Sequence, residues 1–355
     1  MLYMPITLLQ EGMVLACDVH CDSKLNLHKG DVLTDTDKVL IQTCGIGGVY
    51  IASDYTKDVV VNDCMGLIQR AQSLSFVRHV LSTPSYGVEF ERRVNDLLQS
   101  IIDRIQSNEV ILETLYSMRN YDNYTYEHSL RVTILSILIG IKMQLSRNEL
   151  WEIGIAAMLH DIGKVDIDIS VLNSPEKLTI EEWGAIRKHP ITGCAKVRFL
   201  HGYNKNISSA ILQHHEHCDG TGYPFGLHAS DICTYAKIIG VADVYDALTS
   251  QRSYRDAWFP NQALEYMNND ISVQFDADVL SALLEVVVPY PEGSVVILSN
   301  GELAVVINIQ NDNRSLPIVR TISGGESKVY NLAQEPIEIK SMGYTDKRLL
   351  PSVMR

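Results

Sequence analysis

The sequence predicts a mainly α-helical protein in which a helical domain lies between a small N-terminal α/β module and a small C-terminal β module. Three observations support this prediction. Successive helical segments fill residues 121–288, short apolar runs alternate with turn residues in 1–60, and β-branched runs mark 291–340. With 355 residues, the chain is long enough for two or three domains. We place the boundaries at 1–60, 61–119 (a helical linker), 120–289 and 290–355.

The N-terminal module is predicted from a helix that precedes a strand. Thr34 or Asp35 can cap the helix, and Gly45 can end it. Residues 49–51, with the sequence Val-Tyr-Ile, are typical of a strand. A short helix and a short strand together indicate a small α/β module.

A long helix is predicted over residues 88–119. Apolar residues recur along it at helical spacing, which indicates a stripe that is buried against a partner. The stripe consists of Val94, Leu97, Leu98, Ile101, Ile102 and Ile105. Two partners fit it equally well, namely the next domain of the same chain or a second copy in a homodimer.

The central region carries start signals for several helices. Ser146 with Glu149, and Thr179 with Glu182, form capping boxes, which mark two helix starts. Two further buried helices are predicted from the apolar segments 236–248 and 275–287.

Strands are predicted beyond these helices. The β-branched runs 295–298 and 303–307 flank Asn300-Gly301, a dipeptide that is a strong hairpin signal. Two more strands are predicted at 316–322 and 337–339. Together they indicate a small β module after the helical domain.

The composition excludes several classes of protein. A net charge of −13 and a pI of about 5.3 argue against binding of long nucleic acids, which requires a basic surface. A hydrophobic content of 46% excludes a disordered chain. Seven cysteines without regular spacing suit a reducing cytoplasm. No signal peptide is evident, and the longest apolar stretch, 132–143, is too short to span a bilayer, so we expect a cytoplasmic protein without membrane insertion.

Imidazole and carboxylate side chains recur through the central region in a pattern that suits metal ions. They favour Fe, Mn, Zn or Co over Mg and Ca, which prefer oxygen ligands alone. An aspartate has two oxygens, so Asp161 can bridge two cations, and a pair of cations about 3.5–4 Å apart can hydrolyse phosphate esters. The residues of this pattern are His160, Asp161, His189, His214, His215 and Asp243.

Local geometry bears on three of these histidines. His189 precedes Pro190, and a residue before proline is pushed away from helical geometry, so a break between two helices is expected there. His214 and His215 would point about 100° apart on a regular helix, so both reach one site only if that site lies between their directions or if the helix end bends.

The run HDIGK at 160–164 is followed by HHE at 214–216 and by DGTGYP at 219–224. In this order the three motifs resemble the HD-GYP family, a branch of the HD phosphohydrolases that hydrolyses the bacterial messenger cyclic di-GMP. The resemblance extends over residues 121–289. It implies an HD-type helical bundle, and similar short modules precede the catalytic domain in some members.

The resemblance implies a role for each residue of the site. A first metal would be held by His128, His160, Asp161 and Asp243, and a second by His189, His214, His215 and the bridging Asp161. Lys164, Arg252 and Arg255 would contact the substrate phosphates, and Tyr223 would stack on a guanine. The ordinary alternatives are an exposed lysine, surface salt bridges and a structural turn tyrosine. Glu216 and Asp246 are candidate acceptors for the outer nitrogens of the histidines.

One position departs from the family pattern. Some HD-GYP enzymes carry a glutamate four residues before the first ligand histidine, where it helps to hold a third metal, and this chain has Tyr124 there. A phenol is a poor substitute for a bridging carboxylate at neutral pH. We therefore expect two divalent or trivalent transition-metal ions, Fe or alternatively Mn. The departure leaves open whether the product is the linear dinucleotide pGpG or GMP.

These observations lead to a metal-dependent phosphodiesterase that cuts cyclic di-GMP with a hydroxide bridging two metals, in which Asp161 and Lys164 are catalytic. A second hypothesis keeps the site and changes the substrate to another cyclic dinucleotide such as cyclic GMP-AMP. A third is a non-catalytic sensor that binds metal and nucleotide and passes a signal to a protein partner.

Overall fold

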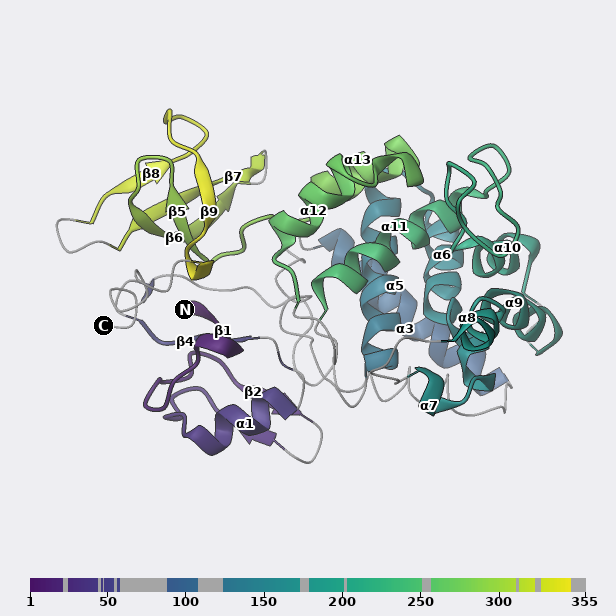
Figure 1. Cartoon of the computed structure of the whole chain (residues 1–355), viewed down its shortest axis with the longest axis horizontal. Helices are drawn as coiled ribbons and strands as arrows, with labels where there is room; N and C mark the ends of the chain where they lie inside the picture. Colours follow the sequence, from purple (N-terminus) through teal and green to yellow (C-terminus); the bar gives the residue numbers. More distant parts are fainter. Residues whose placement is uncertain are drawn as a thin grey trace.

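The computed structural model describes residues 1–21, 25–43, 46, 48–53, 56–57, 88–107, 124–172, 179–200, 203–250, 257–310, 313–322 and 327–345. The protein is mainly helical, with a small β-sheet near its C-terminus (Figure 1). This confirms the predicted fold class.

The helical bundle is organised around α5 (Tyr124–Lys142). Its residues 127–140 are all buried, which explains why this helix is apolar on nearly every side. It contacts four helices, as Figure 1 shows: α3 (Val88–Ser107), α6 (Arg147–Leu159), α11 (Thr234–Thr249) and α13 (Ala277–Val286). The two apolar segments expected at 236–248 and 275–287 correspond to α11 and α13.

Shorter elements complete the bundle and carry much of the candidate site. They are η3 (Ile162–Asp166), α7 (Ile169–Leu172), α8 (Ile180–Ile186), α9 (His189–Leu200), α10 (Lys205–Gln213), α12 (Pro260–Asn269) and η4 (Ser272–Gln274). Both predicted capping boxes are present, Ser146 at the start of α6 and Thr179 at the start of α8. Each capping box gives its helix a defined first turn.

The apolar stripe of the predicted 88–119 helix lies inside the bundle. Its described part is α3, and Val94, Leu98, Ile101 and Ile102 are buried in the same core as α5 and α6. The stripe therefore packs against its own chain, which was one of the two expected partners. Residues 108–119 lie outside the described residues.

The N-terminal segment forms two short antiparallel pairs and one helix. Strand β1 (Leu2–Pro5) pairs with β4 (Gly48–Ile51), and β2 (Val19–Cys21) pairs with β3 (Leu25–Leu27). The 3-10 turn η1 (Ile6–Leu8) follows β1, and helix α1 (Asp35–Thr43) lies between β3 and β4 in the sequence. Thr34 Oγ1 caps α1 by accepting a hydrogen bond from Asp37 N at 3.2 Å. The predicted helix and strand are thus present, while β1, β2 and β3 gave no signal that we recognised.

The C-terminal segment is a five-stranded antiparallel sheet with the strand order β8-β7-β6-β5-β9. Gly301 adopts a positive φ of 84° in the predicted Asn-Gly turn, and the flanking strands pair as a hairpin. A strand was expected at 337–339. The observed strand begins only at residue 339 and continues to residue 342. The strands are β5 (Val295–Leu298), β6 (Leu303–Gln310), β7 (Asn313–Thr321), β8 (Val329–Asn331) and β9 (Ile339–Met342), followed by η5 (Gly343–Thr345).

The two ends of the chain share one hydrophobic core. Buried residues of β1 and β4 form a single cluster with buried residues of β5, β6 and β7, and the two segments lie side by side next to the bundle (Figure 1). Tyr3 N donates to Gly293 O at 3.0 Å, and the Tyr344 hydroxyl donates to Tyr3 O. We call this unit, residues 1–57 and 290–345, the terminal domain. The boundaries proposed from the sequence stay predictions.

Candidate metal centre

The candidate ligands sit at helix ends that converge in the bundle. Helix α6 ends at Leu159, so His160 and Asp161 leave the helix and lead into η3. His189 is the first residue of α9, after a short break that follows α8. His214 follows the last residue of α10. The break expected before Pro190 and the helix end expected at 214–215 are therefore both present.

Two further ligands come from the long helices. His128 lies in the first two turns of α5, and Asp243 lies in the middle of α11. His128 is 4% exposed and Asp243 is 9% exposed, and helix α11 packs directly on α5. Because such groups are costly to bury without partners, their convergence needs a compensating charge.

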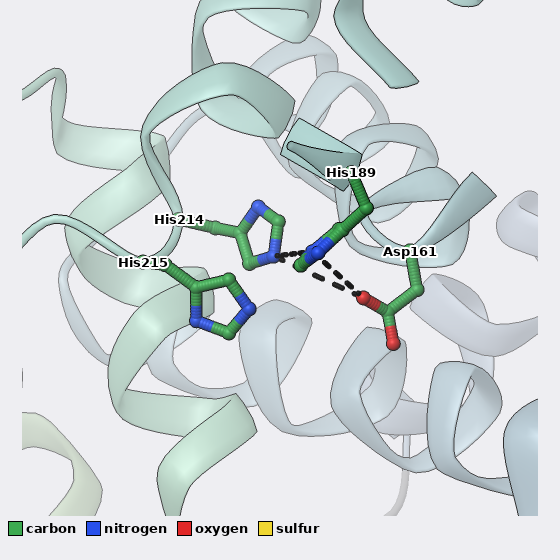
Figure 2. Close-up of side chains that lie close together, drawn as sticks. All are labelled: Asp161, His189, His214 and His215. Carbon is green, nitrogen blue, oxygen red and sulfur yellow. Dashed lines mark hydrogen bonds and ion pairs between the residues drawn. The ribbon is translucent and has the colours of Figure 1, made fainter. Parts of the chain in front are cut away.

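The seven residues form two neighbouring groups. One group is Asp161, His189, His214 and His215, shown in Figure 2, and the other is His128, His160 and Asp243. Within each group, the ligand atoms lie within 4.8 Å of one another. The structure thus brings together all seven expected metal ligands, although they lie far apart in the sequence.

Asp161 faces both groups through its two oxygens. Oδ1 is 3.2 Å from Nε2 of His189, while Oδ2 is 3.4 Å from Nε2 of His160 and 3.7 Å from Nε2 of His128. This is the placement that a bridging carboxylate needs. Asp161 therefore joins the two groups into one centre.

Three ligand histidines are held in the same way. Nδ1 of His160, His189 and His214 each lies 2.7 Å from a backbone carbonyl three residues earlier. A proton on Nδ1 satisfies that carbonyl, so Nε2 is left without a proton and faces the centre. This tautomer is the one that binds metal.

Several polar atoms in the centre lack partners within the described residues, which tests whether cations fit. Nε2 of His160 and Oδ1 of Asp161 are buried without a hydrogen-bond partner there. Nε2 of His189 and Nε2 of His214 lie 3.3 Å apart, although neither carries a proton in the tautomers just assigned. Unpaired acceptors that face one another are unfavourable unless a cation lies among them. The residues therefore fit metal ions.

The charge states also suit cations. Burial lowers the pKa of His214 well below its usual range and that of His215 to about 3, so both rings are neutral at pH 7. Burial raises the pKa of Asp161, but His160 and Lys164 outweigh it and hold that pKa well below its usual value. Burial likewise raises the pKa of Asp243, and the hydrogen bond from His128 outweighs it. The centre thus combines the neutral imidazoles of His214 and His215 with ionised carboxylates.

Lys164 lies at the edge of the centre. Its Nζ is 2.6 Å from Asp161 Oδ2, and its side chain is 28% exposed. A partly exposed ammonium on a buried carboxylate can reach an incoming anion without leaving the site. Lys164 is therefore placed beside the candidate ligands, as expected from its position four residues after His160.

The two candidate acceptors for outer nitrogens behave differently. Asp246 accepts from His128 Nδ1 at 2.7 Å. Glu216 instead accepts from the backbone N–H groups of Phe225 and Leu227, at 2.7 and 2.9 Å. Asp246 thus supports a metal ligand, whereas Glu216 fixes the loop that carries Tyr223.

Tyr223 packs against a ligand. Its ring stacks on His215 with centroids 4.6 Å apart and 27° between the planes. The guanidinium of Arg187 lies 5.0 Å from the centroid of the same ring. Gly222 makes this possible because a Cβ there would lie 2.3 Å from His217 N and 2.5 Å from His215 O. Tyr223 is thus part of the centre's wall.

Some expected residues are not placed, and others were missed. Arg252 and Arg255 lie outside the described residues, and nothing is described of the Tyr124 side chain. Arg187 and Arg131 both reach the centre's surroundings, and sequence analysis overlooked them. Arg131 lies one helical turn after His128, and that spacing was a usable signal, whereas nothing local marks Arg187.

No helix among the described residues is both long enough and apolar enough to cross a membrane.

Comparison with known proteins places this centre in a family context. The HD domain family model matches residues 110–279. The chain is 34% identical to the cyclic di-GMP phosphodiesterase PA4108 of Pseudomonas aeruginosa, over 71% of this chain and 61% of the relative. It is also 34% identical to the cyclic di-GMP phosphodiesterase response regulator RpfG of Xanthomonas campestris, over 62% and 57%.

A third relative and a solved structure extend the comparison. The 3'3'-cGAMP-specific phosphodiesterase 3 of Vibrio cholerae is 34% identical over 45% of this chain and 35% of that relative. A structure described as a HDG"Y"P protein from Bdellovibrio bacteriovorus matches with a TM-score of 0.54 and 19% identity, over 80% of this chain and 98% of that one. This chain therefore shares that fold, and it spans about three fifths of the length of the first two relatives.

Proposed function

Because the chain belongs to the HD-GYP branch of the HD domain family, we propose that it is a metal-dependent phosphodiesterase that hydrolyses cyclic di-GMP. The observation that carries this proposal is the double group of ligands joined by Asp161. The names of the Pseudomonas and Xanthomonas relatives point to the same substrate.

The proposed centre holds two transition-metal ions, Fe or alternatively Mn. When bound, two such ions supply an activated water and neutralise charge on the phosphoryl oxygens. Imidazole-rich ligation with carboxylates suits these metals better than Mg or Ca. His128, His160, Asp161 and Asp243 would hold one ion, and His189, His214, His215 and Asp161 the other.

The chain's own groups would bind and orient the phosphate. The Lys164 ammonium, partly exposed beside Asp161, is placed to contact a phosphoryl oxygen and to stabilise developing negative charge. We propose the same task for Arg252 and Arg255, since guanidinium groups match phosphate oxygens two at a time. Tyr223 would present the edge or free part of its ring to a guanine base, with His215 and Glu216 fixing its loop.

A second substrate class has its own support. The Vibrio cholerae relative is named as specific for 3'3'-cGAMP, so another cyclic dinucleotide is the alternative substrate. A sensor without catalysis is the remaining alternative, and the complete ligand set argues against it. The absence of a carboxylate at Tyr124 favours two metals, and the product is pGpG, GMP or both.

The setting of the enzyme is also a proposal. We expect it to act in the cytoplasm. Its site would bind cyclic di-GMP, and we expect no binding of long nucleic acids. Signalling proteins would dock on its surface. A homodimer through the 88–119 helix would have to use the face of α3 opposite the stripe buried in the bundle.

One experiment tests the proposal most directly. The full chain is purified without oxygen, its Fe and Mn contents are measured, and it is then assayed with cyclic di-GMP and with 3'3'-cGAMP under the same conditions. We expect about two metal ions per chain and faster turnover of cyclic di-GMP. Metal-loaded protein that binds cyclic di-GMP but yields neither pGpG nor GMP would instead identify a sensor.

A further inference from the structure

Four buried side chains form an ionic network behind the His128 half of the centre. They are Glu127, Arg131, Asp246 and Ser250, which are 2%, 3%, 2% and 3% exposed. The first two come from α5 and Asp246 from α11, and Ser250 follows the last residue of α11. None of the four is among the candidate ligands, so their burial calls for a separate explanation.

Arg131 holds Asp246 with two hydrogen bonds. Arg131 Nε donates to Oδ1 at 2.5 Å, and Nη2 donates to Oδ2 at 3.2 Å. Paired contacts of this kind fix the plane of a carboxylate as well as its position. Arg131 also places its positive charge directly on this buried carboxylate. Arg131 therefore holds Asp246 in one orientation.

Asp246 in turn determines how His128 faces the centre. Oδ2 of Asp246 accepts from His128 Nδ1 at 2.7 Å, and the opposite nitrogen, Nε2, lies 3.2 Å from Asp243 Oδ1. The rings of His160, His189 and His214 donate instead to neutral carbonyls. A carboxylate acceptor makes an imidazole a stronger metal ligand than a carbonyl acceptor does.

The two halves also differ in their own charge. Around His128 and His160 lie Asp243 Oδ1 and one oxygen of Asp161. Among the described residues, the group with His189, His214 and His215 contains one carboxylate, Asp161, and the second oxygen of Asp243 lies farther off, 3.8 Å from His215 Nδ1. With Asp246 behind His128, the His128 half is lined by more carboxylates, which favours a divalent cation there. Arg131 adds to this difference because it keeps Asp246 beside His128.

We propose that Arg131 is a positioning residue that, through Asp246, holds His128 ready for a cation and makes the His128 half of the centre fill before the other half. This inference rests on the proposed metal centre. It concerns the order of filling and the residue that sets it, neither of which follows from the identity of the ligands.

The test is a titration of the metal-free full chain with Co²⁺, followed by calorimetry and by the visible absorption of the bound ion. The wild-type protein should bind in two steps, the first tighter. Arg131→Lys keeps the charge but loses the paired geometry, and it should weaken the first step by about 10–100-fold, the usual cost of losing an outer partner. The second step should change much less.

Two more variants grade the effect. Asp246→Asn should weaken the first step at least as much as Arg131→Lys, because an amide removes the negative charge beside His128. Ser250→Ala removes two contacts, the bond from Arg131 Nη2 at 2.9 Å and the bond to Asp246 Oδ2 at 3.2 Å. It leaves the paired Arg131–Asp246 contact in place, so it should have a smaller effect than either. This rank order is specific to positioning through Asp246, and Ser250→Ala is conservative enough to fold if the other two do not.

Arg147→Lys is the matched control. Arg147 also joins two helices, α6 and α3, since it donates to Gln99 and pairs with Asp103 at 2.7 Å. Its side chain is half exposed, and neither of these partners is a candidate ligand. It should leave both steps unchanged. Equal weakening of both steps by Arg131→Lys, or one step with two equal sites in the wild type, would overturn the inference. No Co²⁺ binding at all would overturn the metal centre itself, which separates the two failures.

Discussion

The helical bundle and the terminal domain bury polar groups to very different extents. Among the described residues, the terminal domain buries three polar side chains, Thr56, Ser294 and Thr321, and none of them ionises. The bundle buries histidines, aspartates, glutamates and Arg131, and two of its ligand atoms have no hydrogen-bond partner in the described part of the chain. Because such burial costs free energy, the bundle holds its candidate metal centre at the expense of stability, whereas the core of the terminal domain is mainly apolar.

The largest effect is expected from a substitution of Asp161, the buried carboxylate between the two ligand groups of the bundle. Asp161→Asn removes the charge that faces both ligand groups. Activity should fall by more than about 100-fold, because even outer partners of metal ligands cost 10–100-fold, and the metal content should fall with it. The protein should stay folded. Activity assays, elemental analysis and circular dichroism measure these three properties.

Asp166→Asn is the control for that substitution. Asp166 lies five residues later in η3 and pairs with Lys196 at 2.7 Å on the surface. Exposed pairs contribute little, so activity and metal content should be retained. Wild-type turnover in a clean Asp161→Asn preparation would contradict the assignment of the centre.

The pH dependence of the metal-free protein should also separate the two regions. Burial lowers the pKa of His128, but its bonds and charges with Asp243 and Asp246 outweigh this and raise it to about 9. A pKa above the unfolded value of about 6.5 stabilises the protein below pH 6.5, and this stability is lost as the pH rises to 9. The loss should reach about 3 kcal/mol.

The opposite slope is expected at lower pH. The pKa of His215 is lowered to about 3, so the unfolded chain binds more protons than the folded one between pH 3 and 6.5, and stability should rise with pH there. Urea unfolding of the metal-free protein from pH 5 to 9 tests both slopes. His128→Gln should flatten the upper one, and a wild-type curve without any decline above pH 6.5 would argue against the paired state of His128.

A steric change should act on the packing that positions the ligands. A Cβ at Gly163 would lie 2.0 Å from His189 O and 2.6 Å from Thr192 Oγ1, so η3 and α9 could not approach as they do. Gly163→Ala should cost about 1–3 kcal/mol of stability, as overpacking does. It should also weaken metal binding, because Asp161 directly precedes η3 and His189 begins α9. Thermal unfolding and Co²⁺ binding measure these effects.

Gly184→Ala is the matched substitution in α8. A Cβ there meets nothing within 4 Å, and alanine is favoured over glycine inside a helix by up to about 1 kcal/mol. The control should therefore be neutral or slightly stabilising. A Gly163→Ala protein that is equally stable would mean that η3 and α9 adjust at no cost.

The same contrast explains how much could be predicted from sequence. Capping at Ser146, the Asn300-Gly301 hairpin and the break before Pro190 depend on neighbouring residues, so local patterns contain them. The candidate ligands of the bundle were predicted through motifs that resemble a family. Neither source contained the Arg131–Asp246 contact, which joins residues 115 positions apart.

The terminal domain was the harder part to foresee. Tyr344 and Tyr3 are 341 positions apart, and each lies in a segment with its own plausible module. Alternating apolar residues predict that a strand has a buried face, but they do not say which other segment covers it. For this reason the two modules were expected separately, and their common core came only from the structure.

The smallest effect should come from the contact that joins the chain ends. The buried hydroxyl of Tyr344 donates to Tyr3 O and accepts from Val295 N at 3.1 Å. Tyr344→Phe leaves these two backbone groups without that partner and should cost about 1 kcal/mol or slightly more, with metal content and activity unchanged. Denaturant unfolding and the cyclic di-GMP assay test both halves of the expectation.

Tyr330→Phe, in strand β8, supplies the comparison within the same domain. Its hydroxyl donates to Glu302 at 2.9 Å in a more accessible place, where water can replace the lost bond, so the change should stay within about 0.5 kcal/mol. A Tyr344→Phe protein that loses activity in proportion to its stability would show that the terminal domain also shapes the centre. Retained activity would instead keep the two regions distinct, one serving stability and the other chemistry.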